Sequence, residues 1–313
     1  MLMGRLYATL FSVMYMGMSG ISGMTSFTNT YLFSFLNTFC FPGDTKLLVE
    51  RQDVIQPLPI KEIEIGDVLL PGRTRVTSTF QFYAKGQPMV QLGSVVVSTN
   101  HYVIHEGRLV LAGDHPHAIQ LGPWGEEPLY CLNTTKHTIP VGALTFLDYD
   151  ETAEGDATTL KWVEEQINGA KSQHDAHEYQ DACFAMDGTI RFKTSRGLVA
   201  AEDLQLGDTL STGCTIAGVI RRKVSEVCRL PSGARVTPAT LYWDESSGKW
   251  KRYGETYPYH MEQDEFVSFV AVPHSQLEWE DGTRVRDYME VCSPDAKDAY
   301  TPLLQGAVLK ETE

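Results

Sequence analysis

The feature of this sequence that most constrains its fold is an internal repeat. The segment that opens with "CFPGDTKLL" at Cys40 leads to "PIKEIEIGDVLL", and the segment that opens with "CFAMDGTIRF" at Cys183 leads to "LVAAEDLQLGDTLS". Each reaches a turn of the form apolar-x-apolar-Gly-Asp, at Asp67 and at Asp208. Self-similarity at one long period indicates two copies of a structural unit. A chain of 313 residues has room for two such domains.

The spacing between matched residues stays nearly constant along the two copies. Cys183 lies 143 residues after Cys40, and His274 lies 137 residues after His137. A chance similarity is not expected to keep its register over this length. The repeat therefore divides the chain into an N-terminal segment (1–39), a first domain (40–150), a linker (151–182) and a second domain (183–313).

Short runs rich in β-branched residues, such as "RVTSTFQFY" and "MVQLGSVVVS", are separated by Pro, Gly, Asp and Asn in both copies. Such runs are typical of strands joined by tight turns. They do not alternate with long helical patterns, which excludes a Rossmann-type sheet. Between the copies, Leu160, Val163 and Ile167 recur at helical spacing. We expect an all-β fold of two tandem β domains joined by a short connector helix over residues 158–171.

Cys40 stands at the threshold of the first domain, directly after Phe39. A thiol placed there has one carbonyl within reach, that of Phe39, and attack on it would convert the amide into a thioester. Such a step needs a proton carrier, for which histidine is suited, and hydrogen-bond donors for the oxyanion. The alternative is an inert buried thiol, which is the commonest fate of a free cysteine.

Four sequence elements follow one another in the first copy: Cys40, "IEIGDVL" (63–69), "STNH" (98–101) and "LYCLNTTKHTIPVGAL" (129–144). In this order they resemble the Hint family, whose fold is shared by Hedgehog autoprocessing domains and inteins. The resemblance covers residues 40–150 and, more weakly, 183–290. It implies that the Phe39–Cys40 bond is cut, with Cys40 as nucleophile and His101 assisting collapse of the intermediate, while Ser98 and His137 occupy the positions of the family's threonine and late histidine.

Three departures from the family pattern limit what this resemblance implies. Ser98 replaces a threonine, which keeps the hydroxyl, and Phe39 stands where the Hedgehog type has a glycine. Splicing inteins end in His-Asn, whereas the matching place here reads "TFLDYDE" (145–151). We therefore expect cleavage at the N-terminal edge without splicing, with water or another small nucleophile as the acyl acceptor. Sterol transfer has no support in the sequence.

The second copy has Thr240 where the first has His101, although Cys183, Thr237 and His274 remain. A hydroxyl cannot carry a proton near neutral pH as imidazole does. We interpret the second copy as a degenerate domain that retains the fold.

Metal, cofactor and nucleic-acid sites are not predicted. The histidines of "HEGRLVLAGDHPH" (105–117) fit a metal site by residue type, but the second copy has Asp244, Thr256 and Pro258 at the matching positions. A shared fold therefore needs no ligands there. The six cysteines include no CxxC pair. The net charge of −14 disfavours a broad phosphate-binding surface.

The N-terminal segment is uncharged from Leu6 to Gly43 and follows a basic residue, Arg5. This pattern fits a secretory signal or a membrane anchor, and fits equally an uncharged strand or helix that packs on the protein. The first alternative predicts a secreted or membrane-associated protein with membrane contact through residues 6–39.

Three hypotheses for the whole chain follow. The first is a self-processing protein that uses its own N-terminal segment as substrate and cleaves once, between Phe39 and Cys40. The second is a non-catalytic binding or structural protein built on two β domains of the Hint fold. The third is a membrane-anchored precursor whose anchor is shed by this cleavage.

Overall fold

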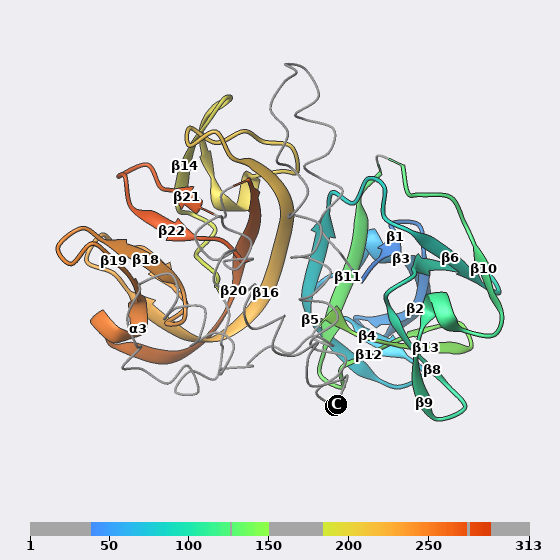
Figure 1. Cartoon of the computed structure of the whole chain (residues 1–313). Coiled ribbons are helices and arrows are strands. Elements are labelled where there is room, and N and C mark those ends of the chain that lie inside the picture. Colours follow the sequence, from blue (N-terminus) through green and yellow to red (C-terminus); the bar gives the residue numbers. More distant parts are fainter. Residues whose placement is uncertain (1–38, 126, 150–183, 274–275, 289–313) are drawn as a thin grey trace, which may run out of the picture. The chain divides into compact units, whose positions relative to one another are not determined.

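A computed structural model describes residues 39–125, 127–149, 184–273 and 276–288 (Figure 1). These residues form two compact units, one of residues 39–149 and one of residues 184–288. The N-terminal segment before Phe39, the predicted connector helix (158–171), Cys183 and His274 lie outside the described residues. We describe each unit by itself.

The first unit is built from three sets of antiparallel strands. The longest path runs in the order β1-β11-β5-β4-β2-β3, and two smaller sheets have the orders β10-β6-β7 and β12-β13-β8-β9. The strands are β1 (Phe41–Pro42), β2 (Lys46–Arg51), β3 (Val54–Pro59), β4 (Val68–Leu70), β5 (Thr74–Phe82), β6 (Met89–Leu92), β7 (Val95–Ser98), β8 (Tyr102–His105), β9 (Arg108–Leu111), β10 (Ala118–Gln120), β11 (Leu129–Thr134), β12 (Thr138–Val141) and β13 (Leu144–Leu147), with short 3-10 helices at η3 (Ile60–Glu62) and η4 (Ala112–Asp114).

Strand β5 shows how the sequence specifies this unit. Every second side chain of "TRVTSTFQF" is buried, from Thr74 through Val76 to Phe82. This alternation places one face of β5 in the core, because successive side chains of a strand point to opposite faces. Strand β11 pairs with β5 in antiparallel register, from Leu129 opposite Phe82 to Thr134 opposite Val76. It is nearly all buried and carries "LYCLNT" through the centre of the unit.

The second unit is organised around two long paired strands, β16 and β20. Two β-bulges interrupt their register, near Gly218 and near Ser225, and Figure 1 shows both strands curved along their length. Bulges bend a strand and increase its twist, which accounts for this curvature. The elements are β14 (Arg191–Thr194), β15 (Gly197–Ala200), η7 (Ala201–Asp203), β16 (Thr215–Arg229), β17 (Arg235–Val236), β18 (Leu241–Asp244), β19 (Lys249–Arg252), α3 (Tyr253–Thr256), β20 (Tyr259–Val272), β21 (Gln276–Glu278) and β22 (Arg284–Arg286).

Both units contain the same turn. In the first, Arg51 donates through Nε and Nη2 to the carboxylate of Asp67, at 2.8 and 2.7 Å. In the second, Arg196 makes the same two-pronged contact with Asp208. The residue before each aspartate is a glycine with positive φ, a conformation that favours glycine. The Gly-Asp motif of the repeat is therefore a turn clamped by an arginine.

The prediction of an all-β protein is confirmed. Among the residues that the structure describes, only the four-residue α3 is α-helical, and three 3-10 turns complete the helical content. Within the same residues, no helix is long and apolar enough to cross a membrane.

Candidate active site

Cys40 lies just before β1 and is hydrogen-bonded to Ser98 in both directions. The amide of Cys40 donates to the Ser98 hydroxyl at 2.9 Å, and the amide of Ser98 donates to the Cys40 carbonyl at 3.0 Å. Both residues are fully buried. The nitrogen of the predicted scissile bond is thus held by a side-chain oxygen, in a place from which bulk water is excluded.

His101 reaches the same place because it follows Ser98 by three residues in a tight turn. Its amide donates to the Ser98 carbonyl at 3.2 Å, and its side chain is fully buried. The imidazole lies near the residues on both sides of Cys40, with its ring centre 4.8 Å from that of Phe41 and 6.4 Å from that of Phe39. Burial lowers the pKa of His101 to about 4 and outweighs the opposing effect of the Leu147 carbonyl. The ring is therefore neutral at physiological pH.

The second unit shows where the side chain at this position points. Its counterpart of the Ser98–Cys40 pair is Thr237 with Ala185, since the amide of Ala185 donates to the Thr237 hydroxyl at 3.1 Å and the amide of Thr237 donates to the Ala185 carbonyl at 2.9 Å. Thr240 follows in the same turn, and its hydroxyl also lies 3.2 Å from the Ala185 amide nitrogen. A side chain three residues after the hydroxyl-bearing residue can thus face the amide.

This comparison corrects one match of the repeat. The sequence pairs Cys40 with Cys183, but Ala185 has the backbone contacts that correspond to those of Cys40. The match made from the sequence is wrong at this position because it rests on the identical dipeptide Cys-Phe in both copies. The hydrogen bonds instead match "FCFPG" with "FAMDG". By these backbone contacts, Ala185 and Thr240 in the second unit occupy the positions that Cys40 and His101 occupy in the first.

Cys131 is a part of the site that sequence reasoning missed. The register of β1 on β11, with Phe41 opposite Tyr130, continues so that Cys40 faces Cys131, and the two thiols interact. Burial raises the pKa of Cys131 well above its usual value, and the neighbouring Cys40 thiol raises it further. Cys131 is therefore a protonated thiol at neutral pH. No local pattern marks it, since only the pairing of two distant strands brings it to Cys40.

His137 lies apart from this buried group. Its side chain is 71% exposed, on a positive-φ position between β11 and β12, and its Nδ1 is 3.5 Å from a carboxylate oxygen of Asp148. Asp148 is fully buried and accepts a hydrogen bond from the Thr134 amide at 2.8 Å. The structure thus brings Cys40, Ser98 and His101 together and places His137 on the surface, in contact with Asp148.

Phe39, on the other side of the predicted scissile bond, is 6% exposed. Its ring makes edge contacts with His101 and with Tyr149, at centroid distances of 6.4 and 6.2 Å. Tyr149 in turn stacks on Phe80 and Phe82. The residue that would carry the acyl group is therefore packed in an aromatic cluster.

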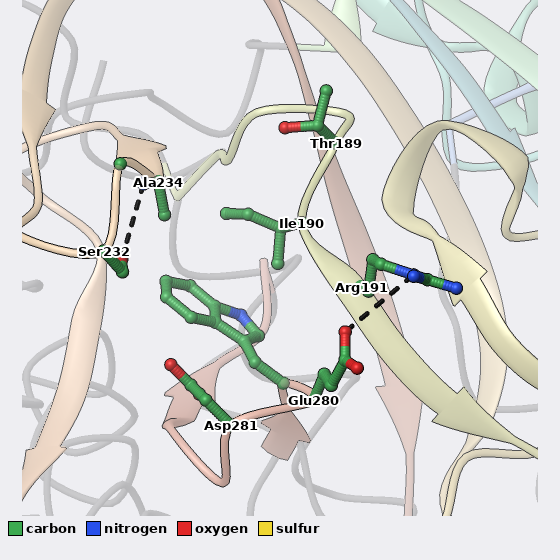
Figure 2. A pocket seen from close by; sticks show the side chains of 9 residues that line it. Thr189, Ile190, Arg191, Ser232, Ala234, Glu280 and Asp281 are labelled. Carbon is green, nitrogen blue, oxygen red and sulfur yellow. Dashed lines mark hydrogen bonds and ion pairs between the residues drawn. The ribbon is translucent and has the colours of Figure 1, made fainter.

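A cavity of about 420 Å³ lies in the second unit, and all its lining residues belong to that unit (Figure 2). The buried side chain of Trp279 is one of its lining residues. Arg191 and Glu280 also line it and form an ion pair of 3.8 Å, which Figure 2 shows. The cavity includes neither Ala185 nor Thr240, so it is separate from the place that corresponds to Cys40 and His101.

Comparison with known proteins identifies no family for this chain. No family model matches it, and no curated protein is similar to it. Among solved structures, crystal structures of the gp41-1 intein and of a variant with three substitutions each match 33% of this chain and 98–99% of the intein chain. The sequence identity is 12% and the TM-score is 0.28 in both cases. A similarity of this size assigns no activity to the chain.

Proposed function

We propose that the first unit is a self-processing domain of the Hint type that cleaves its own chain between Phe39 and Cys40. The observation that carries this proposal is the pair of hydrogen bonds between Cys40 and Ser98 with the imidazole of His101 beside them. In this proposal Cys40 is the nucleophile, His101 is the proton carrier and Ser98 holds the reacting amide. We also propose that the two units are tandem copies of this domain and that the second is inactive.

The Cys40 sulfur attacks the Phe39 carbonyl carbon and gives up its proton to the neutral imidazole of His101 as the bond from sulfur to carbon forms. The carbon-nitrogen bond to Cys40 then breaks. The imidazolium returns its proton to the departing nitrogen, which becomes a free amine. Water or a small nucleophile then attacks the thioester, which releases the N-terminal segment with a carboxylate or an adduct at Phe39 and restores the thiol.

The low pKa of His101 suits the second of these proton transfers. An imidazolium that prefers to be neutral is a strong acid, so it protonates a poor leaving group readily. The Ser98 hydroxyl accepts a hydrogen bond from the same nitrogen and fixes its position before reaction. Within a preorganised pair of this kind, intramolecular attack gains from a high effective concentration.

The test is the intact mass of the full chain with and without added dithiothreitol. We expect a fragment that begins at Cys40, and we expect Cys40→Ala to abolish it. His101→Thr copies the second unit, where Thr240 is accommodated in the same turn, so it should stop cleavage while the domain stays folded. Cys183→Ala is the matched control and should cleave like the wild type. A wild-type chain that stays intact with added thiol would refute the proposal.

A non-catalytic scaffold is the second candidate function. The complete burial of Cys40, Ser98 and His101 favours it, because a packed core also explains that burial. In that case neither the wild type nor Cys40→Ala would yield a fragment, and Cys40→Ala would change only the free energy of unfolding.

A further inference from the structure

Three histidines of the first unit meet on one side of the β8–β9 hairpin. His105 is the last residue of β8, His115 follows the 3-10 turn η4, and His117 lies two residues later. The ring centres of His105 and His115 are 4.4 Å apart, those of His115 and His117 are 5.7 Å apart, and those of His105 and His117 are 6.5 Å apart. Three imidazoles from two separate segments of the chain thus form one cluster.

These distances are close to those of three histidines on one metal ion. Zinc binds imidazole nitrogen at about 2.0–2.1 Å in a tetrahedral arrangement, so the centres of three bound rings are separated by roughly 5 Å. As the rings lie, no three side chains in the described residues are placed to hold a metal ion. Rotation of the rings is needed, and the partial exposure of His105 and the exposure of His117 allow it.

The buried member of the cluster is already held in place. His115 is buried, and its Nδ1 accepts a hydrogen bond from the amide of His117 at 3.2 Å. Ligation through Nδ1 would replace this hydrogen bond with the metal.

We propose that His105, His115 and His117 bind one divalent transition-metal ion, for which Zn²⁺ is the natural probe. Three histidine ligands leave a fourth position for water or another ligand. The second unit has Asp244, Thr256 and Pro258 at the matching positions, so the site belongs to the first unit. Bound metal would link the β8–β9 hairpin to the loop after η4, and the first residue of η4, Ala112, donates to the His101 carbonyl at 2.8 Å.

The experiment is a calorimetric titration of Zn²⁺ into the full chain carrying Cys40→Ala, which removes the candidate nucleophile and prevents cleavage. We expect one strongly bound ion per chain and a weakening of about tenfold or more in His105→Ala and in His117→Ala. Both residues are at the surface, so neither change should unfold the domain. His260→Ala, which removes an exposed histidine of the second unit, is the matched control and should bind like the parent.

Co²⁺ in place of Zn²⁺ distinguishes histidine from cysteine ligands. We expect the visible absorption of a nitrogen-ligated tetrahedral ion without the near-ultraviolet band of a thiolate. The absence of Zn²⁺ binding, a thiolate band, or unchanged binding in the double variant His105→Ala with His117→Ala would each overturn the proposal. Cleavage plays no part in this measurement, so the result tests the metal site independently of the proposed self-processing function.

Discussion

The Nε2 atom of His101 lies 2.8 Å from the carbonyl oxygen of Leu147, at the end of β13. A carbonyl only accepts hydrogen bonds, so Nε2 carries the hydrogen and the neutral ring has its basic lone pair on Nδ1. The strand that ends the first unit therefore fixes which nitrogen of His101 exchanges protons. Proton transfer by His101 therefore depends on this contact, whereas its titration is governed by burial, which the contact opposes.

The first prediction concerns the pH dependence of stability. Burial lowers the pKa of His101 to about 4 from an ordinary value of 6.5, so between these values the unfolded chain binds a proton that the folded chain does not. The contribution of His101 to stability is therefore complete above pH 6.5 and is lost as the pH falls toward 4, by up to about 1.4 kcal/mol per pH unit.

The measurement is urea unfolding of the full chain carrying Cys40→Ala, followed by a probe in the first unit, at several pH values. With His101→Thr added to this chain, the free energy of unfolding should change less between pH 6.5 and 4. Carboxylates titrate alike in both chains, so the difference between the two chains isolates the contribution of His101. Equal slopes with and without His101→Thr would show that His101 is not held neutral by burial.

The sequence predicts the parts of the fold and site that local patterns encode. The alternation in β5, the Gly-Asp turns and the three-residue spacing of Ser98 and His101 are all local, and the structure has each of them. Contacts that depend on strand register are not local, and Cys131 was missed because β11 reaches Cys40 only through pairing with β1.

Two other differences have physical causes. Cys183 was matched to Cys40 by dipeptide identity, but backbone hydrogen bonds give that place to Ala185, two residues later. The resemblance to the Hint family implies that His137 occupies the position of the family's late histidine. The structure instead turns the chain at this residue, with φ of 54°, and leaves its ring on the surface beside Asp148.

The second prediction concerns Ser98. Ser98→Ala removes the acceptor of the buried Cys40 amide, and an unsatisfied buried donor costs about 1–3 kcal/mol. The free energy of unfolding should fall by that amount, and cleavage should slow because the reacting nitrogen is no longer held. Ser98→Thr is the control, since Thr237 makes the same contact in the second unit at 3.1 Å. If Ser98→Ala cleaves as fast as Ser98→Thr, the hydroxyl has no part in the reaction.

The third prediction concerns Cys131. Its thiol stays protonated at neutral pH because burial and Cys40 raise its pKa. Its Sγ donates to the Leu132 carbonyl at 3.8 Å, and the hydrogen can turn to the Cys40 sulfur as negative charge develops there. Cys131→Ala should slow the appearance of the Cys40 fragment by roughly tenfold or more, the effect of one hydrogen bond to a charged group. Cys131→Ser should retain most of the rate, and Cys214→Ala, a buried thiol of the second unit, should retain all of it. A normal rate in Cys131→Ala would exclude this role.

The last prediction concerns Phe39 and rests on the proposed cleavage. Its ring packs against His101 and Tyr149 and is 6% exposed, so it shields the carbonyl that would become the thioester. Phe39→Gly should open this place to water and shift the product from thiol-dependent release toward spontaneous hydrolysis, whereas Phe39→Tyr should keep the wild-type ratio. The ratio is measured by mass, from the fraction of N-terminal fragment captured by hydroxylamine at successive times. If hydroxylamine captures the same fraction of the N-terminal fragment at every time in Phe39→Gly as in the wild type, the aromatic cluster does not protect the thioester.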